Sequence, residues 1–162
     1  MKNLPFICQR EQTAYPNDSC HVACLMMLLK YCQITPLPTY GELCERLGLS
    51  QTLLEGDYDF CLENLFRYLV ERKIPFRMHF LDHGWGQALE QAPIMVAMFG
   101  GRRFWGSGGH TIILISYEQE SFTYLDPWFA QSTGKHIRTL AFKDFKKHYS
   151  GIACQLLLTP SL

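Results

Sequence analysis

The sequence has no excess of positive or negative charge, and no segment concentrates charge of one sign. Fifteen lysine and arginine residues balance fifteen acidic residues, so the formal net charge at pH 7 is zero. No basic run is longer than a pair such as Arg102-Arg103 or Lys146-Lys147. Because binding to a nucleic-acid backbone needs a basic patch or stripe, the sequence predicts no nucleic-acid partner.

Long hydrophobic runs are also missing. No segment reaches the length of about 18 apolar residues that a membrane-spanning helix needs. The first residues, Met1 to Glu11, lack the apolar stretch of a secretory signal peptide. We therefore expect no membrane insertion, and a location in the cytoplasm or export by a route that uses no N-terminal signal peptide.

Cysteines are present, but not in a pattern that binds metal or builds a disulfide framework. The chain has seven cysteines, an odd number at irregular spacings, and no Cys-x-x-Cys pair. Cys20 and Cys24 could share a helix face, yet no second pair of ligands follows at the spacing of a zinc site. The sequence therefore predicts no metal site and no cofactor.

Apolar residues are plentiful, and their period changes along the chain. At 162 residues with 48% apolar content, the chain is long enough for one domain with a large core. Helical spacing predicts helices at 22–32, 39–48 and about 57–74, and strand-like runs follow at 76–80, 94–99, 110–117, 121–126, 137–142 and 151–158, with a short helix at 143–149. Helices followed by an antiparallel sheet define an α+β fold. We expect one domain over 1–162, with a helical part over about 1–75 and a sheet part over about 76–162.

Details of the expected helices can be read from the same pattern. Thr39 and Glu42 form a capping box before the second helix, and Gly48 is its expected stop. In the third helix the apolar positions share one face, which is expected to be buried; they are Leu62, Leu65, Phe66, Leu69 and Val70.

Three residues far apart in the chain supply the groups that thiol catalysis needs. Cys20 lies where the first helix begins, and there the unpaired N–H groups and the helix dipole favour a thiolate. His110 starts one strand of a predicted hairpin, and Asp126 ends the other strand, so antiparallel pairing brings them to the same rim. A thiol, a base and a group that orients the base form a catalytic triad. The Cys20 backbone N–H and the side chain of Gln12 are the candidate oxyanion donors.

Several segments together resemble a known family. They are Gln12 followed by Asp18-Ser19-Cys20-His21-Val22-Ala23-Cys24-Leu25-Met26-Met27, then Gly109-His110-Thr111-Ile112-Ile113-Leu114, then Leu125-Asp126-Pro127, and the closing Asp144-Phe145-Lys146-Lys147-His148-Tyr149-Ser150-Gly151-Ile152. In this order and spacing the chain is similar to the bacteriocin-processing peptidases of the papain-like clan, which include the peptidase domains of peptide exporters.

The resemblance implies a papain-like fold over nearly the whole chain. It also implies that Cys20 is the nucleophile, His110 the base, Asp126 the orienting group and Gln12 a donor in the oxyanion hole. In the exporters, such domains cut leader peptides after a Gly-Gly pair. The expected partner is accordingly a peptide or protein substrate.

The chain departs from the family pattern at two places. The glycine that usually follows the nucleophile is His21, which adds bulk and a titratable ring beside the thiol. The interval from Gln12 to Cys20 is longer than the family pattern by about two residues, and Gln9 lies farther away still. The remaining histidines, His21 included, are otherwise assigned to surface or core.

The residues leave several functions open. Water as the second substrate makes the protein a peptidase that acts on a peptide or isopeptide bond, whereas an amine makes it an acyl or amide transferase. A freestanding leader-type peptidase and a secreted bacterial effector or toxin both fit a thiol hydrolase without a transporter portion. A non-catalytic peptide-binding module of the same fold is the competing class.

Near the site, the glycine-rich stretch at 100–109 is interpreted as a cleft wall or a flexible connection. Trp128 is interpreted as a shield for the His110–Asp126 hydrogen bond or as a core residue.

Overall fold

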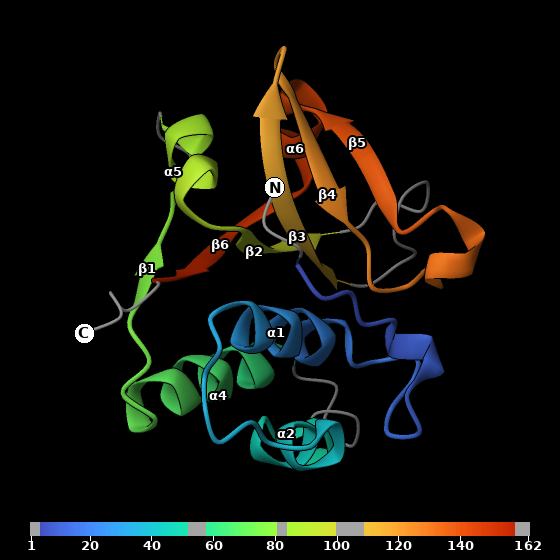
Figure 1. The fold of residues 1–162 in the computed structure, drawn as a ribbon, viewed down its shortest axis with the longest axis vertical. Helices are drawn as coiled ribbons and strands as arrows, with labels where there is room; N and C mark the ends of the chain where they lie inside the picture. The colour runs from blue at the N-terminus through green and yellow to red at the C-terminus, as the bar shows by residue number, and fades with distance from the viewer. Residues whose placement is uncertain (1–3, 52–57, 81–83, 100–108, 158–162) are drawn as a thin grey trace.

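The computed structural model describes residues 4–51, 58–80, 84–99 and 109–157. Helices and strands segregate as expected, with the early helices on one side of a sheet made mainly by the second half of the chain (Figure 1). The helices are α1 (Cys20–Tyr31), α2 (Tyr40–Arg46), α4 (Tyr58–Glu71), α5 (Trp85–Gln91) and α6 (Phe142–His148), with short 3-10 turns η1 (Gln9–Glu11) and η2 (Gln131–Thr133). The strands are β1 (Phe76–Met78), β2 (Ile94–Phe99), β3 (Gly109–Glu118), β4 (Ser121–Leu125), β5 (Ile137–Ala141) and β6 (Tyr149–Leu156).

Helix α1 is the central buried element. Every residue from His21 to Leu29 is buried, so α1 lacks the polar face of a surface helix. It packs between the sheet on one side and α2 and α4 on the other (Figure 1). Burial on all sides holds the N-terminal end of α1, where Cys20 lies, in a rigid position.

The two following helices largely agree with their sequence signals. The capping box of α2 is confirmed, because Glu42 N–H donates to the Thr39 hydroxyl at 3.3 Å and Thr39 N–H donates to the Glu42 carboxylate at 2.7 Å. Gly48 ends the segment with a positive φ of 71°. On α4 the prediction that Val70 is buried was wrong. Leu65 and Leu69 are fully buried, but Val70 is 64% exposed. The reason is that Val70 lies outside the helix face that packs against α1.

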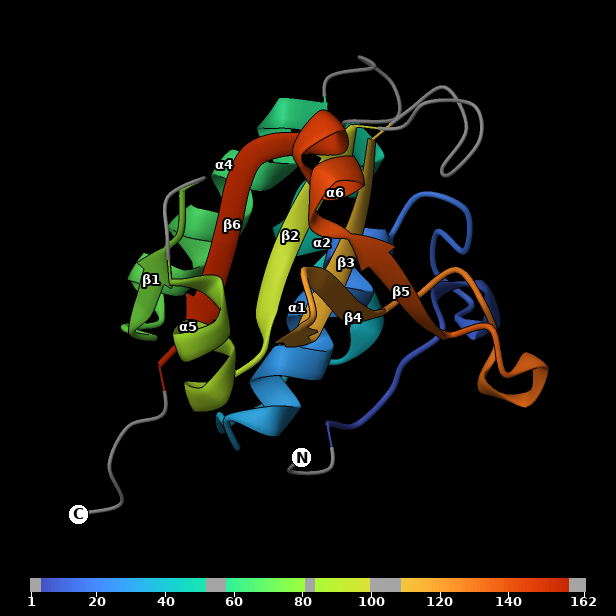
Figure 2. The ribbon, with the colours of Figure 1, turned by 90° about the horizontal axis from the view of Figure 1, so that it is seen from above.

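The six strands form one antiparallel sheet in the order β1-β6-β2-β3-β4-β5. Both faces of this sheet are covered (Figure 2). One face packs on α1, α2 and α4, and the other packs on α5 and α6. Double coverage explains why β2 and β3 read as nearly continuous apolar runs, without the alternation of a sheet that has one wet face.

Helix α5 was missing from the predictions. Its seven residues, starting after Gly84 in a left-handed conformation, are too few to show a helical period. Its Trp85 inserts among aromatic rings on the outer face of the sheet, with Phe122 and Phe145 in edge contact at 5.8 and 5.5 Å between centroids. Within the described residues, no helix combines the length and the apolar character that crossing a membrane requires.

Candidate active site

The N-terminal end of α1 presents the Cys20 thiol at the edge of the sheet. Ala23 N–H donates to the Ser19 carbonyl at 2.9 Å, which closes the first helical turn around Cys20. The Cys20 side chain is half-buried, whereas Cys24, one turn later, is fully buried with its sulfur 3.4 Å from the Thr111 carbonyl oxygen. Only the first of these two thiols can therefore meet a substrate.

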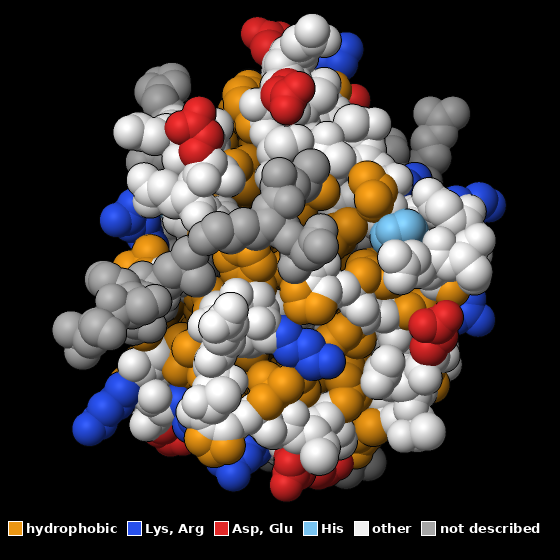
Figure 3. All heavy atoms as spheres, in the orientation of Figure 1, with side chains coloured by type: hydrophobic (Ala, Val, Ile, Leu, Met, Phe, Trp, Pro, Cys, Tyr) orange, Lys and Arg blue, Asp and Glu red, His pale blue; other side chains and the backbone are white. Residues whose placement is uncertain are grey.

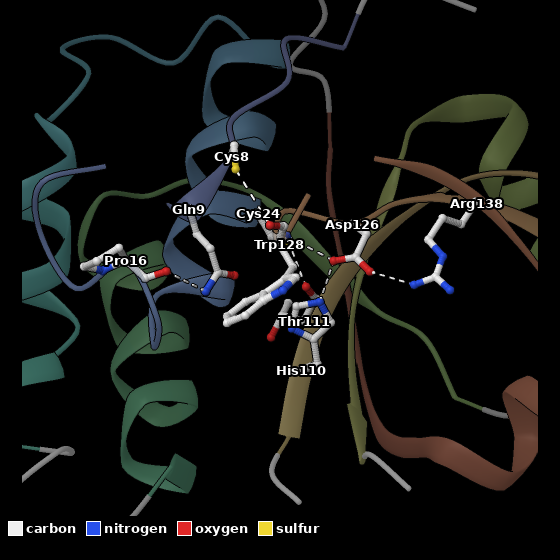
Figure 4. A network of polar contacts seen from close by, with 9 residues as sticks. All are labelled: Cys8, Gln9, Pro16, Cys24, His110, Thr111, Asp126, Trp128 and Arg138. Carbon is white, nitrogen blue, oxygen red and sulfur yellow. Dashed lines mark hydrogen bonds and ion pairs between the residues drawn. The ribbon is translucent and has the colours of Figure 1, made fainter. Parts of the chain in front are cut away.

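The hairpin of β3 and β4 brings His110 and Asp126 together, as the antiparallel arrangement predicts. Ile113 pairs with Leu125 in the register of the two strands, so the start of β3 and the end of β4 lie at the same rim. The His110 ring nitrogen Nε2 lies 2.8 Å from Asp126 Oδ1 (Figure 4). Both side chains are buried, at 8% and 1% exposure, and a hydrogen bond in such a dry environment is strong.

The imidazole of His110 also hydrogen-bonds the Cys20 thiol. Because Nε2 is bound to Asp126, Nδ1 is the ring atom left for the sulfur. Cysteine, histidine and aspartate therefore form one continuous chain of contacts across the boundary between α1 and the sheet.

Asp126 is held by more than its histidine. Its Oδ1 also accepts the Trp128 backbone N–H at 3.1 Å, and its own N–H donates to the His136 carbonyl at 2.8 Å. On the other side, the Arg138 guanidinium approaches Oδ2 at 3.5 Å (Figure 4). A buried carboxylate with these partners keeps one orientation, with Oδ1 toward the imidazole.

The electrostatics of the site favour a thiolate beside an imidazolium. Burial alone would raise the pKa of Cys20, but hydrogen bonds and charges from His110 and His21 outweigh it and hold that pKa well below its ordinary value. Burial alone would lower the pKa of His110, but hydrogen bonds to Asp126 and Cys20, together with their charges, raise it to about 9. By contrast, burial raises the pKa of Cys24 well above the ordinary thiol value. The site thus activates one sulfur selectively.

Of the two nearby glutamines, Gln9 faces the site. Its side chain is buried, at 1% exposure, and points toward Trp128 and His110 in the view of Figure 4. Its Nε2 donates to the Pro16 carbonyl at 3.2 Å, and its backbone N–H donates to the Pro127 carbonyl at 2.8 Å. Gln12 instead turns its Nε2 back to the Cys8 carbonyl at 3.0 Å. The structure therefore does not show Gln12 at the reacting groups, where the sequence placed it, because the 3-10 turn η1 directs its amide to its own backbone.

His21 has a larger part in the site than the sequence suggested. Its side chain is only 5% exposed, and its imidazole is a hydrogen-bond partner of the Cys20 thiol. The adjacency of His21 and Cys20 in the sequence was the signal for this contact. Arg138 offered no such signal, because its approach to Asp126 depends on the pairing of β5 with β4.

Two further expectations concern the walls of the site. Trp128 is half-buried, and the Arg10 guanidinium lies over its ring, 4.9 Å from the ring centre. The predicted cleft wall at 100–109 lies almost wholly outside the described residues.

Among the described residues, no three histidine, cysteine or acidic side chains gather as a metal centre would require.

Comparison with known proteins points to one group of structures. No protein-family model and no curated protein matches the sequence. The peptidase domain of Streptococcus ComA, a bifunctional ABC transporter of a quorum-sensing pathway, superposes with a TM-score of 0.61 at 15% identity, over 97% of this chain and all (100%) of that one. A C39-like peptidase from Bacillus anthracis gives 0.59 at 14% identity, over 98% and 96% of the two chains.

A third structure belongs to the same group. The double glycine motif protease of an AMS/PCAT transporter, in complex with its leader peptide, gives a TM-score of 0.58 at 17% identity, over 97% of this chain and 93% of that one. The chain therefore has the papain-like fold of the C39-like cysteine peptidases. The α+β fold predicted from the sequence and the resemblance to double-glycine, bacteriocin-processing peptidases are both confirmed.

Proposed function

We propose that this protein is a cysteine peptidase in which Cys20 is the nucleophile, His110 the general base and acid, and Asp126 the orienting group. The contact chain from the Cys20 thiol through His110 to the buried Asp126 carries this proposal. Its opposed pKa shifts favour an ion pair of thiolate and imidazolium near neutral pH.

The reaction follows from these roles. The Cys20 thiolate attacks the carbonyl carbon of the scissile bond, and His110 gives its proton to the leaving amine. Water then attacks the thioester, and His110 takes up the proton that the water loses. Asp126 keeps the imidazole in its orientation throughout.

The tetrahedral intermediates need two donors for their oxyanion. The Cys20 backbone N–H is the first, because it lies at the helix terminus beside the sulfur. For the second, Gln12 is the donor that the sequence favours, but its amide donates to the Cys8 carbonyl, and Gln9, whose buried side chain points toward His110 in Figure 4, is the alternative. Loss of one oxyanion donor costs about 100-fold to 1000-fold in kcat, so comparison of Gln9→Ala with Gln12→Ala assigns the role.

For the substrate we propose an extended peptide that carries a Gly-Gly pair before the scissile bond. The support is the likeness to a double glycine motif protease that was solved with its leader peptide bound. Action inside the cytoplasm on a leader peptide, and action as an exported effector on foreign proteins, both fit this substrate class. If an amine resolves the thioester in place of water, the product is a transferred acyl group.

Site-resolved alkylation tests the triad without knowledge of the substrate. Iodoacetamide is applied from pH 4 to pH 10, and modification of each cysteine is followed by mass spectrometry in wild type and in His110→Ala. We expect rapid modification of Cys20 below pH 7 in the wild type and its loss in the variant. His148→Ala, which removes an imidazole from α6, is the matched control and is expected to behave as wild type.

Cleavage of quenched fluorescent peptides with a central Gly-Gly pair completes the test. Cleavage that disappears in Cys20→Ala supports the peptidase. If Cys20 instead titrates like an ordinary thiol at about 8.5 and no peptide is cleaved, the enzyme assignment is wrong and the protein is a peptide-binding module.

A further inference from the structure

The peptide unit between Ser19 and Cys20 is held by a backbone and a side-chain donor. Its carbonyl oxygen, on Ser19, accepts the Ala23 N–H at 2.9 Å and lies 3.1 Å from the Tyr40 hydroxyl. The same Tyr40 hydroxyl lies 2.8 Å from Ser19 Oγ, so its single proton is shared between the carbonyl and the hydroxyl oxygen of Ser19. Ser19 is completely buried, so these contacts form away from competing water.

The Ser19 hydroxyl does not have its usual function. A serine that precedes a helix normally accepts a hydrogen bond from one of the first backbone N–H groups. Here the side chain makes no such bond, and its hydroxyl donates instead to the Tyr15 carbonyl at 2.7 Å. The Ser19 hydroxyl therefore does not occupy the N-terminal amide N–H groups of α1.

Helix α2 supplies the residues that hold this segment. Tyr40 is the first residue of α2 and lies between the two residues of the capping box, and Glu45, farther along the helix, accepts the Tyr15 hydroxyl at 2.9 Å. Tyr40 is half-buried, and this burial raises its pKa above the ordinary tyrosine value, so its hydroxyl keeps its proton. Helix α2 thus makes hydrogen bonds with Tyr15 and Ser19, in the segment that precedes the nucleophile.

The geometry of a trans peptide links these contacts to the chemistry. The carbonyl of Ser19 and the N–H of Cys20 belong to one planar unit and point in opposite directions. Donors that fix and polarise the carbonyl therefore fix the direction of the N–H and strengthen it as a donor. An oxyanion donor needs this kind of preorganisation.

We propose that Tyr40 is a positioning residue for the oxyanion hole, which acts through the Ser19–Cys20 peptide. The inference rests on the proposed peptidase function. Tyr40 touches neither the thiol nor the imidazole in any contact described above, so it stabilises the intermediate that carries the oxyanion without activating the thiolate.

Two reagents separate these steps in Tyr40→Phe. Iodoacetamide alkylates the thiolate by direct displacement and forms no oxyanion, whereas a peptide aldehyde that ends in glycyl-glycinal forms a hemithioacetal whose oxygen occupies the oxyanion position. We expect alkylation of Cys20 and its pH profile to stay within about twofold of wild type. The affinity for the aldehyde and kcat for the Gly-Gly peptide are expected to fall about tenfold, with little change in KM. Tyr31→Phe, which removes a tyrosine hydroxyl at the far end of α1, is the matched control.

The outcomes are distinguishable. If the wild type binds the aldehyde and cleaves the peptide, but Tyr40→Phe does both equally well, the positioning role is wrong and the peptidase stands. Equal losses in alkylation and in aldehyde affinity assign Tyr40 a merely structural role and also overturn the inference. A wild type that neither binds the aldehyde nor cleaves peptides overturns both proposals. The amide signal of Cys20 in nitrogen-15 spectra is a second readout, expected to move in Tyr40→Phe and to stay in place in Tyr31→Phe.

Discussion

At the scale of single residues, the site shows how neighbours and not residue type decide the reactivity of a thiol. Burial raises the pKa of Cys154 to about 12 and that of Cys32 to about 11. Cys20 is also affected by burial, yet its pKa is lowered because two imidazoles contact its sulfur. A reactive cysteine is therefore recognised by its partners, of which one here is adjacent in the sequence and the other is distant.

The opposed pKa shifts predict a bell-shaped dependence of kcat/KM on pH. Activity rises as Cys20 loses its proton, well below the ordinary thiol pKa, and falls near pH 9 as His110 loses the proton that the leaving amine needs. In Asp126→Asn the alkaline limb moves to lower pH by roughly one to three units, because the carboxylate that raises the pKa of His110 is gone. Initial rates on the Gly-Gly peptide from pH 4 to pH 10 measure both limbs. An unmoved alkaline limb in the variant contradicts the assignment of Asp126.

Arg138 offers a second prediction at this scale. Its guanidinium stacks 5.3 Å from the Phe129 ring centre and approaches Asp126 Oδ2 from outside the site. Arg138→Met keeps the length of the side chain but loses the charge, and we expect kcat to fall by about threefold, because the pair is long and partly solvated. Arg138→Lys should recover part of the loss. Equal kcat values in wild type and both variants would mean that Trp128 and His136 suffice to orient the carboxylate.

At the scale of the helices, local signals and tertiary packing agree on α2. Thr39 and Glu42 form the capping box that their spacing predicts, since this motif depends only on residues three positions apart. For α4 the spacing was less informative. Leu65, Leu69 and Val70 all fit one broad helical face, and only the position of α1 decides that Val70 remains 64% exposed.

The cap of α2 can be tested by its contribution to stability. Thr39→Ala removes the acceptor of the Glu42 N–H and is expected to lower the free energy of unfolding by about 1 kcal/mol. Urea unfolding followed by circular dichroism measures the change. Thr13→Ala, at an exposed position before α1, is the control and should stay within about 0.5 kcal/mol of wild type. A cap variant as stable as this control would show that tertiary contacts alone hold α2.

At the scale of the whole molecule, the candidate active site lies where two layers meet. Cys20 comes from the helical layer, and His110 and Asp126 come from the sheet. The space-filling view along the axis of Figure 1 shows apolar side chains between and around polar ones across much of this face (Figure 3). The relative position of the layers depends on the buried apolar core that α1 shares with the sheet.

The core on the outer face of the sheet gives the prediction at this scale. Phe145 of α6 is fully buried against Phe122 and Trp85, so Phe145→Ala is expected to lower the free energy of unfolding by about 3–5 kcal/mol. Under conditions where this variant remains folded, alkylation of Cys20 should keep its wild-type pH profile, because Phe145 packs on the opposite face of the sheet from α1. Phe99→Ala, at a position that is 61% exposed, is the control. A changed profile in the folded Phe145→Ala variant would show that the outer core positions the triad.

The sequence by itself determined the features that depend on neighbours along the chain. The α+β order of elements, the capping box and the hairpin that brings His110 beside Asp126 follow from periodicity, turn chemistry and strand pairing over short separations. The triad residues could be proposed because each lies at the end of a predicted element. Helix α5 escaped prediction because seven residues are too few for a period to show.

Only the tertiary structure decided which distant groups share one space. It buried the side chain of Gln9, tied the amide of Gln12 to the Cys8 carbonyl, placed Tyr40 on the peptide before the nucleophile, and brought Arg138 to Asp126. These contacts depend on the angle at which α1 packs between α2 and the sheet and on the pairing of β5 with β4. Long-range packing of this kind leaves no periodic trace in the sequence, because many side chains together determine it and no single spacing records it.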